Sequence, residues 1–270
     1  MKIFQDKSPF YGQDPYAVLY QNKYLLIESQ DEERIAIITW RSLDDMRNSV
    51  SITVWDNPQE HQVWAPELHL INGRWYIYYS SSNGTNESHR NKALIADSPF
   101  GPYFPLGIVG LDIWGIDLTI FNHENKRYAI WSGWEHNGDG YPQHLYISDF
   151  ENLKERTKIS SPLYNWEKSI EPINEGPQAW YNSNGKLCLF FSANASWTQD
   201  YCTGLMVLVG EDPLNPDHWF KKPSPLLYNA GHGQPIGDRF LYHKKLSNSP
   251  GWQDRVIVTM LLSNVVRDYG

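Results

Sequence analysis

Short apolar runs separated by polar turns follow one another along the whole chain, and helical periodicity is almost absent. One pattern recurs: a polar residue, a short apolar run, a turn, and then an aromatic-rich run. Its five copies begin at Asp14, Glu67, Asp117, Glu175 and His232. The copies are 53, 50, 58 and 57 residues apart, so they fill the 270-residue chain. Such equal spacing predicts a repeat architecture.

Each unit has the pattern of short β-strands. The first two runs flank a turn that carries Asn-Gly or a related polar pair, which is a hairpin signal. These turns are expected at Gln21–Lys23, Asn72–Gly73, Glu124–Asn125, Asn184–Gly185 and Gly237–Asp238. A third run follows over 34–40, 92–96, 144–148, 204–209 and 255–260. A fourth, weaker run precedes the next unit, as at 50–55 and 104–109, but in the short fifth unit it is unclear.

Four short strands in a unit that is repeated five times describe a β-propeller. We therefore predict an all-β fold, a five-bladed β-propeller. No linker or shift in composition interrupts the chain, so residues 1–270 are expected to form a single catalytic domain. Aromatic hairpins also occur in β-sandwiches, but a sandwich does not account for the equal spacing.

The composition narrows the class of protein. The chain is 41% hydrophobic and 20% charged, with a mean hydropathy of −0.54, which is typical of a soluble globular protein. Its 14% aromatic content suits β-structure or stacking against ring-shaped ligands. The net charge of −8 disfavours nucleic acid as a partner, and no apolar run is long enough to cross a membrane. No secretory signal is visible in residues 1–15, so we expect a cytoplasmic protein, or a secreted one if the chain has been trimmed.

The two cysteines are too few for a disulfide framework or a zinc ribbon. In the hairpin expected in the fourth unit, Cys188 faces Met206 and Cys202 faces Ser192. Four strand residues at about 3.3 Å each would separate the cysteines by ~13 Å. A disulfide needs Cα atoms within about 7 Å, so both are expected to be reduced core residues.

The innermost strand of every propeller blade runs beside the central channel, so the polar residue that opens each unit should lie on a common ring. The ring would hold four carboxylates and one histidine. Two carboxylates ~7 Å apart, at an effective dielectric constant of ~20, repel by about 2.4 kcal/mol. We therefore expect some to stay ionised and at least one to be protonated near neutral pH. Acid–base hydrolysis of a glycosidic bond needs that split, whereas turn capping or binding of a structural cation is the alternative role.

Short motifs surround the ring positions: Asp14-Pro15, Trp-Ala-Pro-Glu (64–67), Ile-Asp-Leu-Thr-Ile-Phe (116–121), Glu-Gly-Pro (175–177) and Gly-His-Gly (231–233). Together with the stretches 131–135, 160–167 and 196–202, they resemble glycoside hydrolase family 43, over about residues 10–245. The resemblance implies a five-bladed propeller that hydrolyses arabinan, arabinoxylan or xylan fragments with inversion. After His232 the sequence departs from the family, because Gln234-Pro235 stands where members usually have Ser-Phe.

Carried over by position, the resemblance implies a role for each ring residue. Asp14 is the general base that activates water, and Glu175 is the general acid that protonates the leaving oxygen. Asp117 orients Glu175 and keeps its pKa high. His232 matches the channel histidine, which in some members sits beside a calcium ion, and Glu67 is a supporting or substrate-contacting group. Inversion implies carboxyl groups of the acid and the base roughly 6.5–9.5 Å apart.

Aromatic residues near the ring are candidates to stack on the apolar faces of sugars. They are Trp64, Trp114, Trp134 and Trp197, and packing between blades is the alternative role of each. His89-Arg90 resembles a pocket pair of arabinofuranosidase-like members, with a solvated loop as the equal alternative. Nine histidines show no metal-binding spacing such as His-Glu-x-x-His.

The first hypothesis is therefore a glycosidase that releases terminal α-L-arabinofuranose from arabino-oligosaccharides or arabinoxylan fragments. A β-xylosidase or an endo-arabinanase on the same fold is the second, and a non-catalytic glycan-binding propeller is the third. The expected partner is an oligosaccharide or polysaccharide, with neither nucleic acid nor a membrane. No cofactor is required, and a Ca²⁺ ion in the channel near His232 is the candidate cation.

Overall fold

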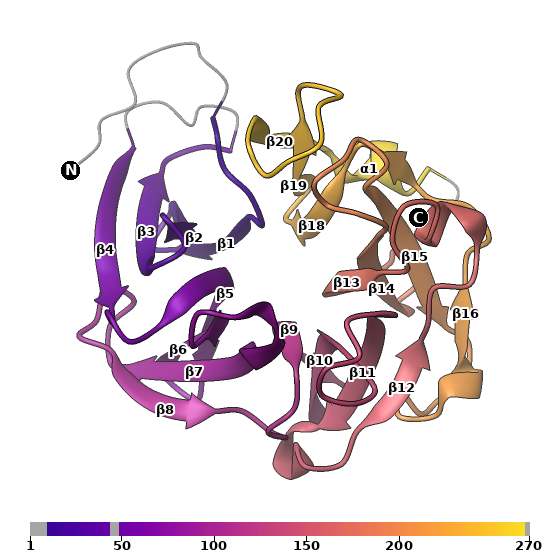
Figure 1. Cartoon of the computed structure of the whole chain (residues 1–270), viewed down its shortest axis with the longest axis horizontal. Helices are drawn as coiled ribbons and strands as arrows, with labels where there is room; N and C mark the ends of the chain where they lie inside the picture. The colour runs from indigo at the N-terminus through magenta and orange to yellow at the C-terminus, as the bar shows by residue number, and fades with distance from the viewer. Residues whose placement is uncertain (1–9, 44–48, 268–270) are drawn as a thin grey trace.

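The structure is a computed structural model that describes residues 10–43 and 49–267. These residues form five antiparallel sheets set around a common axis, as Figure 1 shows. The predicted five-bladed β-propeller is thus confirmed. Part of the segment considered for a secretory signal, residues 1–9, lies outside the described residues. Among the described residues, no helix is both long and apolar enough to span a bilayer.

The first three blades each contain four strands. Blade one comprises β1 (Tyr16–Tyr20), β2 (Lys23–Gln30), β3 (Arg34–Trp40) and β4 (Val50–Asp56). Blade two comprises β5 (His61–Ile71), β6 (Arg74–Ser82), β7 (Arg90–Ala96) and β8 (Phe104–Ile108). Blade three comprises β9 (Gly115–His123), β10 (Lys126–Gly133), β11 (His144–Asp149) and β12 (Thr157–Ser160).

The last two blades are less regular. Blade four comprises β13 (Asn174–Tyr181), β14 (Leu187–Ala193), β15 (Cys202–Leu208) and β16 (Trp219–Lys221), with β17 (Leu227–Tyr228) also paired to β15. Blade five comprises β18 (Gly231–Ile236), β19 (Arg239–Lys245) and β20 (Arg255–Leu261). The helical elements are short: η1 (Asn86–Ser88), η2 (Phe150–Asn152), η3 (Asn165–Glu167), η4 (Pro216–His218) and α1 (Leu262–Val265).

The expected turns join the first two strands of every blade. Gln21 and Asn22 have φ angles of 49° and 60°, and Asn72 and Gly73 have 51° and 80°. Positive φ at both central residues matches the right-handed twist of the strands that the turn connects. In blade four the connection is longer, over residues 182–186, and Gly185 takes the left-handed conformation with a φ of 73°.

Blade five obtains its missing outer strand from the other end of the chain. The Ile257 N–H of β20 donates to the Phe10 carbonyl at 2.8 Å, and the Gly12 N–H donates to the Arg255 carbonyl at 3.1 Å. Tyr11 forms an antiparallel bridge with Val256. The fourth run of the fifth unit is therefore absent after β20 because residues 10–12 occupy its place.

The hydrophobic core lies between neighbouring sheets. One cluster joins blades one and two around Ile37, Leu68 and Trp75, and another joins blades three and four around Ile147 and Phe191. The apolar side chains thus hold the blades together side by side. The axis of the propeller remains for polar groups.

Both cysteines are buried and free, as predicted. Their expected strand partners are wrong by one residue. Cys188 pairs with Val207, and Cys202 pairs with Ala193. The hydrophobic pattern does not fix where the irregular loop 194–201 ends, and a one-residue shift changes every cross-strand neighbour.

The contact between the first and last blades yields a prediction for Gln234. Its side-chain amide donates to the Ala17 carbonyl at 3.0 Å and accepts from the Ala17 N–H at 2.8 Å, and all these atoms are buried. Gln234→Ala leaves the Ala17 groups unpaired, so we expect a loss of about 2 kcal/mol of unfolding free energy. Urea unfolding measures it, with the exposed Gln59→Ala as a control that should change little. An unchanged Gln234→Ala midpoint would contradict this role.

Candidate active site

The five inner strands, β1, β5, β9, β13 and β18, surround the axis (Figure 1). Residues of all five blades line a cavity of about 410 Å³. Of the residues selected from the sequence, those that line it are Asp14, Trp64, Trp114, Asp117, Glu175, Trp197 and His232. These residues come from all five blades and are far apart in the sequence, so only this architecture brings them together. The three candidate catalytic carboxyl groups therefore share one cavity.

Irregular backbone turns the polar side chains toward the cavity. Asp14, Asp117 and His232 have φ angles of 47°, 59° and 49°, in the left-handed region that non-glycine residues seldom adopt. In blade four, Gly176 takes this conformation with a φ of 53°, directly after Glu175. The strand pairing shifts by one residue between Glu175 and Gln178, and such a bulge re-aims the side chains beside it.

Glu67 and Trp134 are not among the residues that line the cavity. In β5 the left-handed residues are Gln62 and Ala65, with φ angles of 49° and 44°, and Glu67 lies two residues beyond Ala65. Its buried carboxylate interacts with His69 Nε2 at 2.8 Å and accepts a hydrogen bond from Gln178. Trp134 lies behind the cavity wall, where it stacks on Trp114 with ring centroids 4.1 Å apart.

Asp14 has the environment of an ionised carboxylate. Its oxygen lies 3.4 Å from His232 Nδ1 and also 3.4 Å from His243 Nδ1. Burial raises the pKa of Asp14, but the nearby His232 and Arg255 lower it below its ordinary value. Burial also lowers the pKa of His243 to about 3. That ring is therefore neutral near pH 7, and its Nδ1 accepts the Asp14 N–H at 3.0 Å.

Glu175 has the opposite environment. Burial and then the negative charge of Asp117 raise its pKa well above the ordinary value, although a hydrogen bond from Tyr201 opposes this. The Tyr201 hydroxyl donates to Glu175 Oε1 at 2.8 Å. Two carboxyl groups of one cavity therefore have pKa values shifted in opposite directions, which is the arrangement that general acid–base catalysis requires.

Asp117 lies between these extremes. Its pKa is raised to about 6, chiefly by burial, while His232 opposes the shift and the charge of Asp14 adds to it. One carboxylate oxygen accepts the Gly176 N–H at 2.9 Å. Asp117 is consequently mostly ionised at pH 7 and holds the backbone next to Glu175.

Three residues that sequence reasoning did not select also shape the cavity. Tyr201 touches Glu175, His243 touches Asp14, and Arg255 lines the wall and lies only 5% exposed. Tyr201 falls within the 196–202 stretch that resembles the family, so it could have been found there. Gly231 must lack a side chain to leave room for Tyr201, because a Cβ atom there would lie 1.8 Å from the Tyr201 ring.

His89 does not lie in a solvated loop. It is fully buried, and its ring stacks on Trp64 with centroids 3.8 Å apart. Its two nitrogens contact the carbonyl oxygens of Asn86 and Gln62 at 2.9 and 3.1 Å. His89 therefore supports the wall of the cavity from behind, through Trp64.

The candidate calcium ion near His232 has no suitable set of ligands among the described residues. Within residues 10–43 and 49–267, no group of three or more His, Cys, Asp or Glu side chains is arranged to hold a metal ion. Calcium takes 6–8 oxygen ligands at about 2.3–2.6 Å. His232 instead offers a nitrogen that faces Asp14 at 3.4 Å and Asp117 at 3.9 Å, as in ion pairs. These residues do not fit a calcium site.

The axis of the propeller thus holds a cavity whose carboxyl groups have opposite pKa shifts, as a hydrolase that uses general acid–base catalysis requires. Comparison of the sequence with known families identifies the family of the protein, because the model of Glycosyl hydrolases family 43 matches residues 8–249. The chain belongs to this family and is a glycoside hydrolase. The resemblance noted in the sequence motifs is thereby confirmed.

The relatives that have curated names show low sequence identity to this chain. The chain is 28% identical over 232 residues to an extracellular exo-alpha-(1->5)-L-arabinofuranosidase of Streptomyces chartreusis, covering 77% of this chain and 70% of the relative. It is 27% identical over 264 residues to alpha-L-arabinofuranosidase 43 of Humicola insolens, covering 86% of this chain but only 54% of that protein. The crystal structure of an alpha-L-arabinofuranosidase from Lactobacillus brevis superposes with a TM-score of 0.85 at 23% identity, over 96% of this chain and 92% of the other. This last similarity shows the fold.

The neighbours of Glu175 allow its pKa to be shifted in both directions. Asp117→Asn removes a negative charge that raises the pKa of Glu175, so we expect this pKa to fall. Tyr201→Phe removes a hydrogen bond that lowers it, so the pKa should rise. Titration of the carboxyl carbons by NMR, with Glu175→Gln to assign the signal, measures both changes. Shifts of the same sign in the two variants would contradict the assignment of causes.

Proposed function

We propose that this protein is an inverting exo-acting α-L-arabinofuranosidase that releases terminal α-L-arabinofuranose from arabino-oligosaccharides or arabinoxylan fragments. The observation that carries the proposal is the pair Asp14 and Glu175, whose pKa values shift in opposite directions within one cavity. The specificity is supported by the names of the curated relatives, which are arabinofuranosidases.

In the proposed reaction, the protonated Glu175 donates its proton to the glycosidic oxygen as the bond to the anomeric carbon breaks. Asp14 removes a proton from a water molecule that attacks the same carbon from the opposite face, so the configuration inverts. Asp117 stays ionised and disfavours early loss of the Glu175 proton. The expected separation of about 6.5–9.5 Å between the acid and the base leaves room for this water.

Aromatic residues at the rim suit the rest of the substrate. Trp252 lines the cavity yet remains 54% exposed, and its ring lies 5.1 Å from that of Trp197. The apolar face of a sugar stacks well on such a ring, so the two tryptophans are proposed to hold the leaving part of the oligosaccharide. Trp64 and Trp114 also line the cavity and are proposed to contact the terminal sugar.

Replacement of the proposed acid gives the first test. Glu175→Gln should lower the rate roughly 10²–10⁴-fold on aryl α-L-arabinofuranosides with a poor leaving group. Substrates whose leaving group departs without protonation should be affected far less. Steady-state kinetics on a series of leaving groups measure this, with the exposed Glu211→Gln as a matched control. A rate within threefold of the parent on the poor leaving group would exclude Glu175 as the acid.

Product analysis distinguishes the proposed specificity from its alternatives. With linear arabinan we expect arabinose as the sole early product, and proton NMR should first detect the inverted anomer. Mixed oligosaccharides would identify an endo-arabinanase instead, and preferential hydrolysis of aryl β-xylosides would identify a β-xylosidase. Binding of arabinosides and xylosides without any turnover would favour the non-catalytic glycan-binding propeller.

A further inference from the structure

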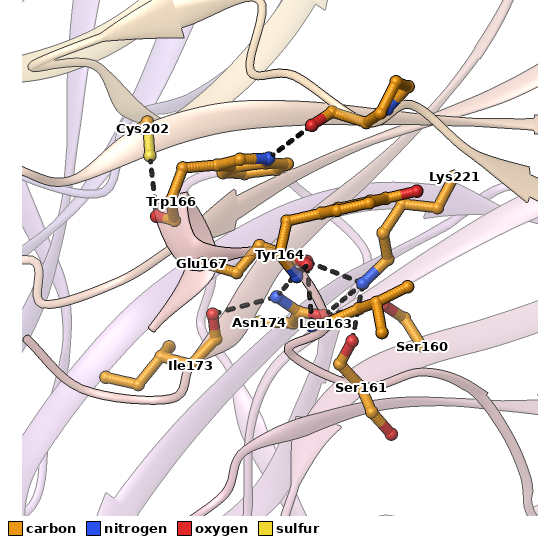
Figure 2. Close-up of polar contacts among 11 residues, drawn as sticks. Ser160, Ser161, Leu163, Tyr164, Trp166, Glu167, Ile173, Asn174, Cys202 and Lys221 are labelled. Atoms are coloured by element: carbon orange, nitrogen blue, oxygen red, sulfur yellow. Dashed lines mark hydrogen bonds and ion pairs between the residues drawn. The ribbon is translucent and has the colours of Figure 1, made fainter. Parts of the chain in front are cut away.

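A network of polar groups surrounds the side chains of Glu167, Asn174 and Lys221 (Figure 2), and these three residues are not among those that line the cavity. Its centre is Glu167, at the end of η3, whose side chain is fully buried. The Glu167 carboxylate accepts hydrogen bonds from the N–H groups of Leu163 and Tyr164, both at 2.7 Å. It also accepts from Asn174 Nδ2 at 2.9 Å and from Lys221 Nζ at 2.6 Å.

Lys221 supplies the opposite charge from β16. Its ammonium group donates to Glu167 Oε1, to Asn174 Oδ1 at 2.9 Å and to the Ser161 carbonyl at 2.7 Å. An ammonium group has three N–H donors, so each of them has an acceptor here. The Lys221 ammonium group therefore has no donor left for a ligand, so the role of the ion pair lies in what it holds.

What the ion pair holds is the side chain of Asn174, the residue directly before Glu175 in β13. Figure 2 shows Lys221, Glu167 and Asn174 converging. The Asn174 amide donates to Glu167, while its oxygen accepts from Lys221 and from Ser160 at 2.6 Å. Since both ends of the amide are engaged by buried partners, the start of β13 has one fixed orientation.

The proposed acid is thus fixed from both sides. Asn174 is anchored on one side, and Gly176, whose N–H donates to Asp117, is anchored on the other. We propose that the Glu167–Lys221 pair positions Glu175 for proton donation by holding Asn174. This inference rests on the proposed function, because it assumes that Glu175 is the general acid.

The chemistry of the pair favours positioning over stabilisation. A buried ion pair adds little to stability compared with well-packed apolar residues, because removing two charges from water is costly. A fully satisfied network, however, specifies a single arrangement of its members. A general acid gains from this, since proton transfer requires hydrogen-bond reach of the leaving oxygen.

Glu167→Gln tests the inference. All groups that face the carboxylate are donors, so the amide N–H₂ of glutamine must face donors whichever way it turns. We expect kcat on a poor-leaving-group aryl arabinofuranoside to fall at least tenfold. KM, and kcat on a good-leaving-group substrate, should stay within about threefold. Thermal unfolding identifies temperatures at which the variant is folded.

Two further variants keep the test decisive. Glu60→Gln is the matched control, because Glu60 pairs with Lys92 at 3.1 Å and accepts from Tyr79, but is not among the residues that line the cavity. This variant should leave kcat unchanged on both substrates. If Glu167→Gln does not fold, Ser160→Ala takes its place, since it removes a single hydrogen bond to Asn174. Ser160→Ala should lower kcat selectively on the poor-leaving-group substrate, but only a fewfold.

The outcomes separate the two proposals. Equal losses on both substrates, or a lower unfolding temperature with unchanged kinetics, would overturn the positioning role of Glu167. This conclusion holds if Glu175→Gln itself shows the leaving-group selectivity. If Glu175→Gln shows no selectivity, the assignment of the acid fails, and the inference fails with it.

Discussion

The closure of the ring between the first and last blades is the constraint on which the rest depends. Residues 10–12 complete blade five, and the Asp14 N–H, Ala17 and Gly12 each hydrogen-bond to residues more than 200 positions away. These bonds place the Asp14 carboxylate beside His232 and His243. The pKa of Asp14 is therefore lowered only in the closed propeller. Folding and the proposed chemistry thus depend on the same contacts.

The strained backbone at the axis follows from the same geometry. Non-glycine residues in sparsely populated backbone conformations cost on the order of 1–3 kcal/mol each and persist where the surroundings fix them. Asp14, Asp117 and His232 adopt such conformations, and each has fixed neighbours, such as the Ser192 hydroxyl that accepts the His232 N–H. Regular strands would direct alternate side chains into the blades, so these irregularities are what gather the carboxyl groups in one cavity.

The sequence predicts the fold well and the site in part. The equal spacing of the repeats and the turn residues within them can be read directly from the sequence. They therefore predict five blades and the shared cavity of Asp14, Asp117 and Glu175. Bulges blur the register, because one extra residue changes which side chain faces the axis. The repeat spacing predicts Glu67 on the ring, but β5 has two such shifts before it and Glu67 does not line the cavity. His243 and Arg255 come from β19 and β20, where nothing local marks a channel position. The outer strand of blade five is supplied across the whole chain length, which a local pattern does not reveal.

Two separate groups of residues act on Glu175, and their separation has a physical logic. Asp117 and Tyr201 adjust its proton affinity through charge and hydrogen bonding, and both must lie close to the carboxyl group. The Glu167–Lys221 pair would perturb that balance if it lay equally close, because a full charge acts strongly in a poorly solvated site. Connected instead through the amide of Asn174, the pair contributes rigidity while its two charges compensate each other. Geometry and proton affinity can thus be set by different side chains.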